Sequence, residues 1–151
     1  MDAVVVPLSF LDLLGRLLLA TLFGALIGLN REQEGKPAGL RTHALVALGA
    51  ATLMIVGLLL QASDSGSASR VLQGIVAGVG FIGAGVILHR EDARTVEGLT
   101  TAAAIWTVAA IGVAAGAGLW RTAASALAVA FLLLVAGERV DRWIHRDQPR
   151  P

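Results

Sequence analysis

The sequence predicts an all-α membrane protein, a compact bundle of about five transmembrane helices with the N-terminus outside and the C-terminus in the cytoplasm. Three observations predict this fold class. Hydrophobic residues make up 56% of the 151-residue chain, its mean hydropathy is +0.74, and its charges gather between long apolar runs. Several runs approach the roughly 20 apolar residues that a helix needs to cross a bilayer. The chain is therefore expected to cross the membrane several times.

Apolar windows place the expected helices at residues 8–29, 44–61, 71–88, 100–119 and 122–140. Four helices with one re-entrant segment are the alternative, because the second and fifth windows are short or end near a charge. Thr42 and Thr100 stand just ahead of apolar runs, so both are expected to be helix N-caps. Residues 1–140 are thus expected to form the transmembrane domain, and residues 141–151 a short basic cytoplasmic tail.

The orientation follows from the distribution of Lys and Arg, which membranes retain on the cytoplasmic side. These residues gather in the first and third connections and in the tail, whereas the second and fourth connections offer only Arg70 and Arg121. Asp12 and Arg16 interrupt the first apolar run, so we expect a retained helix rather than a cleaved signal peptide. The chain has no cysteine, which excludes disulfides and thiolate chemistry.

Small residues recur at four-residue spacing along the expected helices. Such spacing lets helix backbones approach closely in lipid, where the hydrophobic effect does not drive helices together. One interpretation is packing within a single bundle, and the other is a homodimer face or a helix that lines a narrow polar path. The expected packing residues are Gly24, Gly28, Gly74, Gly78, Gly80, Gly83, Gly85, Trp106, Gly112 and Gly116.

Three polar residues fall inside or beside the apolar windows. Asp12 and Arg16 lie four residues apart, so they share a helix face and can form an ion pair. Ionisable residues within a membrane span indicate a functional site by default, although a pair at the membrane surface only anchors the helix. Gln73 begins the glycine-rich helix, where it either joins two helices by a hydrogen bond or lines the mouth of a cation or proton path.

Two charged segments are expected to meet at the cytoplasmic surface. Contact with anionic lipid headgroups explains their basic residues. Two sharper interpretations remain open: Mg²⁺ binding by Glu32, Glu91, Asp92 or Glu97, because Mg²⁺ prefers carboxylate oxygens, and sensing of acid by His43 and His89. The candidate residues of this surface are Arg31, Glu32, Gly39, Arg41, Thr42, His43, Arg90, Glu91 and Thr100.

Three segments, in order, carry a family resemblance: GALIGLNREQEGKPAGLRTHALVALGAA, GIVAGVGFIGAGVILHRE and VEGLTTAAAIWTVAAIGVAAGAG. They resemble the membrane domain of the MgtC/SapB family of bacterial inner-membrane proteins. The resemblance implies a multi-pass protein of the bacterial inner (plasma) membrane, linked to adaptation to low magnesium, acid or host stress. It implies a non-enzymatic regulator that acts on the proton-driven ATP synthase, or alternatively a Mg²⁺ or proton transporter.

The sequence departs from the family pattern at four positions. Asn30 replaces an acidic residue, Glu97 replaces a basic one, and Thr95 and Thr107 replace the Asn and Cys of the namesake branch. The tail after residue 140 is short, so we expect no soluble C-terminal domain like that of many members. The sequence contains no zinc-ligand spacing, phosphate-binding loop or catalytic triad. It therefore predicts neither an enzyme nor a cofactor, and it gives no sign of a nucleic-acid partner.

Overall fold

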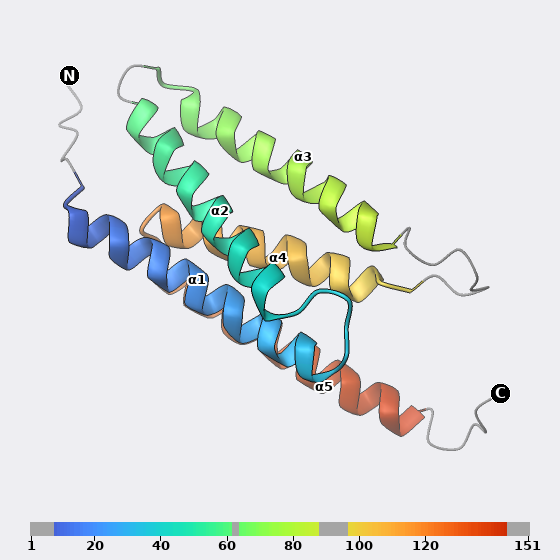
Figure 1. Ribbon diagram of the computed structural model, residues 1–151. Coiled ribbons are helices and arrows are strands. Elements are labelled where there is room, and N and C mark those ends of the chain that lie inside the picture. The colour runs from blue at the N-terminus through green and yellow to red at the C-terminus, as the bar shows by residue number, and fades with distance from the viewer. Residues whose placement is uncertain (1–7, 62–63, 88–96, 145–151) are drawn as a thin grey trace.

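The computed structural model describes residues 8–61, 64–87 and 97–144, and over these residues the chain forms five α-helices. In chain order they are α1 (Phe10–Gln33), α2 (Leu40–Leu60), α3 (Ser67–Ile87), α4 (Leu99–Gly116) and α5 (Trp120–Ile144) (Figure 1). All five are long and apolar enough to cross a membrane. The predicted fold class, an all-α bundle of about five membrane-spanning helices, is confirmed.

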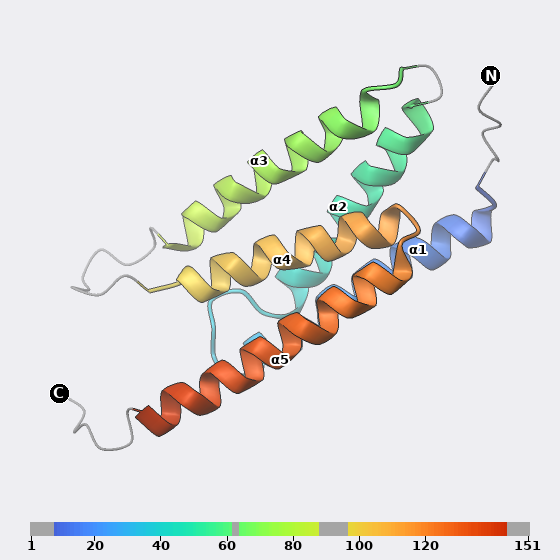
Figure 2. The ribbon, with the colours of Figure 1, turned by 180° about the vertical axis from the view of Figure 1, so that it is seen from behind.

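Helix α4 is the centre of the bundle, because it packs against each of the other four helices. Helix α2 packs against α1, α3 and α4, whereas α5 contacts α4 and α1. Seen from behind, α3 and α5 lie on opposite sides of α4 (Figure 2). The outer helices α3 and α5 are therefore attached to the rest of the bundle mainly along one side.

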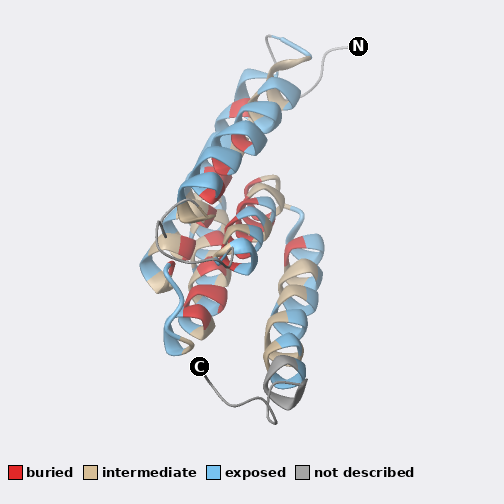
Figure 3. Cartoon of the chain, turned by 90° about the vertical axis from the view of Figure 1, so that its right-hand side faces the viewer, coloured by how far each residue is buried: buried red, intermediate tan, exposed pale blue. Residues whose placement is uncertain are grey.

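The core between α1, α2 and α4 is made of small and aliphatic side chains, with Ala20, Ala47, Ala51, Val108 and Ile111 fully or almost fully buried. In Figure 3 the buried residues follow these inner helices, whereas α5 is largely exposed. Its one buried residue among those described is Ala123. Small side chains let the three inner helices approach closely, which is the packing that lipid favours.

Glycines bring α2 against α4 with no room for a side chain. A Cβ added at Gly112 would lie 2.4 Å from the carbonyl oxygen of Ala47, and one at Gly116 would lie 2.5 Å from that of Ala51. Across the other face of α2, a Cβ at Gly24 of α1 would lie 2.5 Å from the carbonyl oxygen of His43. Backbone therefore touches backbone on both sides of α2.

Two helices end at a glycine in the left-handed conformation. After α1, Gly35 has φ +66°, its N–H donates to the carbonyl of Glu32, and the N–H of Lys36 donates to that of Arg31. The same pair of bonds follows α4, where Gly118 has φ +78°. This is the Schellman motif, which satisfies carbonyls that a helix end leaves unpaired. It explains why α4 ends at Gly116, three residues before the predicted end.

The N-cap predictions for Thr42 and Thr100 are wrong, because both residues lie inside helices. Gly39 precedes α2 and Gly98 precedes α4, and neither has a side chain that can cap. The one side-chain cap among the described N-cap residues is Ser9, whose Oγ accepts a hydrogen bond from the N–H of Asp12 at 3.1 Å. The apolar windows located the spans but missed helical turns made of polar residues.

Candidate functional site

The charged segment between α1 and α2 lies at one end of the bundle, which we call the hinge end. The C-terminal ends of α1, α3 and α5 and the N-terminal ends of α2 and α4 all lie there (Figure 1). Glu32, in the last turn of α1, connects the two ends of this segment, because its Oε2 accepts a hydrogen bond of 2.8 Å from the N–H of Leu40. A carboxylate at a helix N-terminus also interacts favourably with the helix dipole. Glu32 thus caps α2 from the neighbouring helix.

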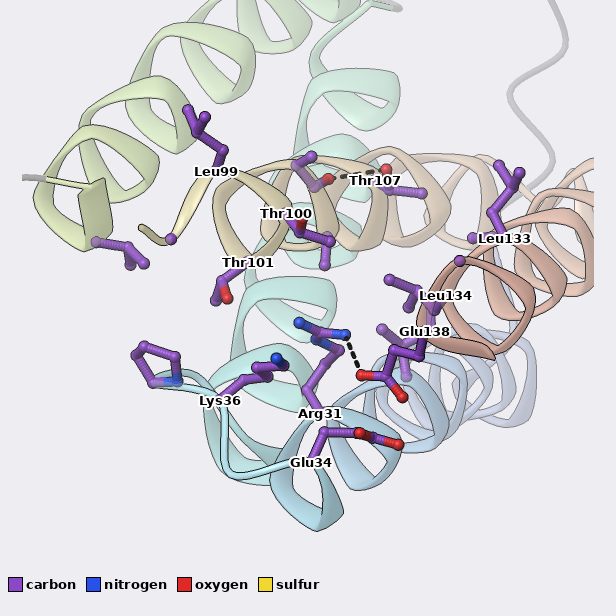
Figure 4. Close-up of a pocket in the computed structure, with 18 of the residues that line it drawn as sticks. Arg31, Glu34, Lys36, Leu99, Thr100, Thr101, Thr107, Leu133, Leu134 and Glu138 are labelled. Carbon is purple, nitrogen blue, oxygen red and sulfur yellow. Dashed lines mark hydrogen bonds and ion pairs between the residues drawn. The ribbon is translucent and has the colours of Figure 1, made fainter. Parts of the chain in front are cut away.

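Arg31 is buried although the sequence placed it on the cytoplasmic surface. Helix α1 continues four residues past the predicted end at residue 29, and this extra turn carries Arg31 into the bundle, where its side chain is 2% exposed. Its Nη1 lies 3.5 Å from Oε1 of Glu138 on α5 (Figure 4). That separation exceeds the 2.7–3.2 Å typical of N–H···O hydrogen bonds. The Nε atom is buried and has no hydrogen-bond partner among the described residues.

His43 is also buried, which corrects its placement at the cytoplasmic surface. It lies in the second turn of α2, under Gly24 and Gly28 of α1, and is fully inaccessible. Its Nδ1 lies 2.9 Å from the carbonyl oxygen of Gly39. A carbonyl only accepts, so Nδ1 donates and carries the proton. This bond joins the ring of His43 to the N-cap residue of α2.

A pocket of about 1390 Å³ opens between α4 and α5 and reaches the hinge end; we call it the α4/α5 groove. Its walls are apolar side chains of the two helices, including Ala103, Ala126, Val129, Ala130 and Leu133. Its polar head contains two cations and three carboxylates, supplied by Arg31, Lys36, Glu34, Glu97 and Glu138. Figure 4 shows Arg31, Lys36, Thr101 and Glu138 around this head, with Leu133 and Leu134 farther along α5.

Asp12 and Arg16 do not pair with each other. Arg16 instead reaches the end of α4, where its Nη1 donates a hydrogen bond of 2.9 Å to the carbonyl oxygen of Gly116. A cation there satisfies a helix-end carbonyl and interacts with the negative end of the dipole. Asp12 is exposed in the first turn of α1. The predicted pair fails because a helix 100 residues away offers Arg16 a better partner.

The glycines of α3 divide between two faces. Gly83 is buried against α4. A Cβ added at Gly83 would lie 3.5 Å from the Cβ of Ala102. The other four predicted packing glycines of α3 do not pack against a helix of the same chain, because no described atom of a neighbouring helix lies within 4 Å of an added Cβ. These four residues are Gly74, Gly78, Gly80 and Gly85.

The remaining candidates lie on the surface or outside the described residues. Gln73 is exposed on α3, Trp106 is 49% exposed on α4, and Arg41 and Thr100 are exposed at the hinge end. Thr42 is half-buried. His89, Arg90, Glu91 and Asp92 lie outside the residues that the structure describes, so the proposed meeting of two charged segments is untested. Over the described part of the chain, no three His or acidic residues are grouped to hold a metal ion.

Glu138 is the residue that the sequence analysis missed. It occupies the fifth apolar window, and an acid in a membrane span marks a candidate site by default. That signal was available in the sequence. Its partner Arg31 stands 107 positions earlier, and nothing in the spacing joins the two.

Comparison with known proteins identifies the family. Residues 17–143 match the model of the MgtC family. The chain belongs to the MgtC family. It is 43% identical to the protein SrpB of Synechococcus elongatus over 94% of this chain and 85% of that protein.

Two further relatives carry the family's name. This family member is 42% identical to the protein MgtC of Salmonella typhimurium over 83% of this chain and 54% of that protein. It is 46% identical to the protein MgtC of Brucella abortus over 77% of this chain and 46% of that protein. The chain thus spans about half the length of the MgtC proteins it matches. No solved structure matches it.

Proposed function

We propose that this protein is a non-enzymatic regulator in the bacterial inner membrane, which binds another membrane complex through the outward face of α3. The hinge end is proposed to face the cytoplasm, since basic residues are retained there. Family membership supports a role in adaptation to low magnesium, acid or host stress. The family resemblance makes the proton-driven ATP synthase the first partner to examine.

The observation that carries the proposal is the face of α3. Gly74 and Gly78 are exposed, and no described helix of the chain approaches them. Small residues are enriched where membrane helices contact one another, because they allow close backbone approach. A helix face of this kind that is exposed to lipid can pack against a helix from another chain.

The centre of the bundle supports a regulator rather than a transporter. The buried polar residues of the described chain are Arg31, His43 and Thr101. All three lie within the turns nearest the hinge end, and Ala51, Val108 and Ile111 fill the core beyond them. An ion path requires polar groups along its length, because an uncompensated charge in hydrocarbon is costly. Gln73 is exposed on α3 rather than turned into this core.

Co-purification of partners after crosslinking in bacterial membranes tests the proposal. Gly78→Leu places a bulky side chain on the outward face of α3 and is expected to abolish recovery of the partner complex. Gly49→Leu is the matched control, because Gly49 is an exposed glycine of α2 with equally open surroundings. Equal recovery with both variants would contradict the proposal. Recovery of only a second copy of this chain would make the α3 face a homodimer contact instead.

A further inference from the structure

The head of the α4/α5 groove contains a buried hydrogen-bond donor that has no acceptor among the described residues. Arg31 is 2% exposed, its Nε has no partner among the described residues, and its Nη1 approaches Glu138 only to 3.5 Å. A buried polar group without a partner costs free energy, and a charged one costs more. Because Arg31 points into the groove (Figure 4), a ligand there can supply the missing acceptor.

The N-terminus of α4 opens into the same head. Leu99, Thr100 and Thr101 line the groove, and the N-cap Gly98 has no side chain to satisfy the first-turn N–H groups. Such N–H groups and the positive end of the helix dipole favour an anion, most often a phosphate. Lys36, which also lines the head, adds a second cation. Three independent elements thus converge on a site for one phosphate.

The carboxylates decide which phosphate ligand fits. Glu34, Glu97 and Glu138 line the same head as Arg31 and Lys36. A ligand with negative charge alone would face three carboxylates, and one with positive charge alone would face two cations and a helix N-terminus. A zwitterion can place its negative charge beside the two cations and the helix N-terminus and its positive charge beside the carboxylates. A primary ammonium suits the carboxylates better than a quaternary one, because it has three N–H donors.

The walls of the groove indicate the rest of the ligand. Val129 and Leu133 of α5 and Ala103 of α4 are exposed along apolar helices that span the membrane, so the groove is open to lipid along its length. Its volume of about 1390 Å³ exceeds the roughly 300–1,000 Å³ of pockets that hold small molecules. A long amphiphile matches this combination of polar head and apolar walls.

We propose that the α4/α5 groove is a binding site for a zwitterionic phospholipid with a primary ammonium, of the phosphatidylethanolamine class. Its phosphate lies between Arg31, Lys36 and the N-terminus of α4, and its ammonium faces the carboxylates. The acyl chains lie along α4 and α5. The groove is not lined by Gly74 or Gly78 of the α3 face, and the site does not depend on the proposed regulatory function.

Native mass spectrometry of the delipidated full chain tests the site. The protein is titrated with phosphatidylethanolamine, phosphatidylglycerol and phosphatidylcholine that carry identical acyl chains. Phosphatidylethanolamine is expected to bind about tenfold more tightly than either of the others, as loss of one charge-assisted hydrogen bond implies. Equal affinities, or a preference for either of the other lipids, would overturn the proposal.

Two neighbouring leucines provide a matched pair of variants. Leu133 lines the groove and Leu132 does not, yet their exposures are 67% and 66%. Leu133→Trp fills the groove and is expected to weaken binding of phosphatidylethanolamine about tenfold, whereas Leu132→Trp leaves it unchanged. Lys36→Ala, at an exposed position, removes a contact to the phosphate and is expected to weaken binding of phosphatidylethanolamine without loss of folding. The same binding in all three variants would overturn the site.

Discussion

Gly112 shows how a single hydrogen atom in place of a side chain sets the distance between two helices. The backbone of α4 lies against that of α2 at this point, and a Cβ would stand 2.4 Å from the carbonyl oxygen of Ala47. Neither partner is a flexible side chain that can move aside. Gly116 repeats the contact one turn later, against Ala51. The position of α2 on α4 therefore depends on these two residues.

Gly112→Ala is expected to lower the free energy of unfolding by about 1–3 kcal/mol, the usual cost of overpacking a tight core. Gly49→Ala is the control, because that glycine has no described atom of another helix within 4 Å of an added Cβ. Its stability is expected to be unchanged or slightly higher, since alanine favours helix over glycine. Unfolding followed by circular dichroism in detergent measures both. Equal midpoints in the two variants would contradict the close contact.

At the scale of the helix, α2 depends on a cap that its own sequence does not contain. Gly39 precedes it, and the carboxylate of Glu32 on α1 accepts the hydrogen bond from Leu40 instead. The bond crosses the six-residue connection between the two helices. It fixes the entry of α2, and with it the position of His43 beneath Gly24 and Gly28.

Glu32→Ala is expected to destabilise the first turn of α2 by about 1 kcal/mol, the typical value of an N-cap side chain. Amide hydrogen exchange at Leu40 should become faster, whereas exchange in the middle of α2 should not change. Gln33→Ala, at the adjacent exposed position, serves as the control and should leave the first turn protected. An unchanged exchange rate at Leu40 in the Glu32 variant would exclude the capping role.

The sequence located the helices but not their ends. Apolar length decides whether a segment crosses a bilayer, so five windows gave five helices. The last turn of α1 is polar, and its end depends on the left-handed Gly35 rather than on hydropathy. The N-cap of α2 was misplaced because Glu32 acts across a connection, and that of α4 because a glycine stands before the helix. Local patterns do not record such contacts.

The candidate site could be predicted only in part. Helical spacing placed Asp12 and Arg16 on one face, but it carried no information about Gly116, to which Arg16 donates. The ion pair of Arg31 with Glu138 joins the first helix to the last. Glycine spacing likewise predicted close packing, without indicating that Gly112 faces α2 while Gly78 faces outward. Each of these features depends on tertiary structure.

Across the whole molecule, the polar and apolar parts are separated along the bundle axis. The hinge end holds buried Arg31 and His43 and the head of the α4/α5 groove, and the inner helices beyond it are closed by alanine, valine and isoleucine. Two of the open surfaces on the described residues are the outward face of α3 and the groove beside α5. On this arrangement we base the proposal that the protein binds others within the membrane and does not carry ions through it.

The most direct test of that claim measures Mg²⁺ and proton flux into proteoliposomes that contain the purified protein. The account predicts vesicles as tight as protein-free vesicles of the same lipid, because the described core beyond the hinge end is made of apolar side chains. Vesicles with the Asp12→Asn variant, which removes the exposed acid in the first turn of α1, should be equally tight. Saturable flux above the protein-free level would contradict the account and identify the chain as a transporter.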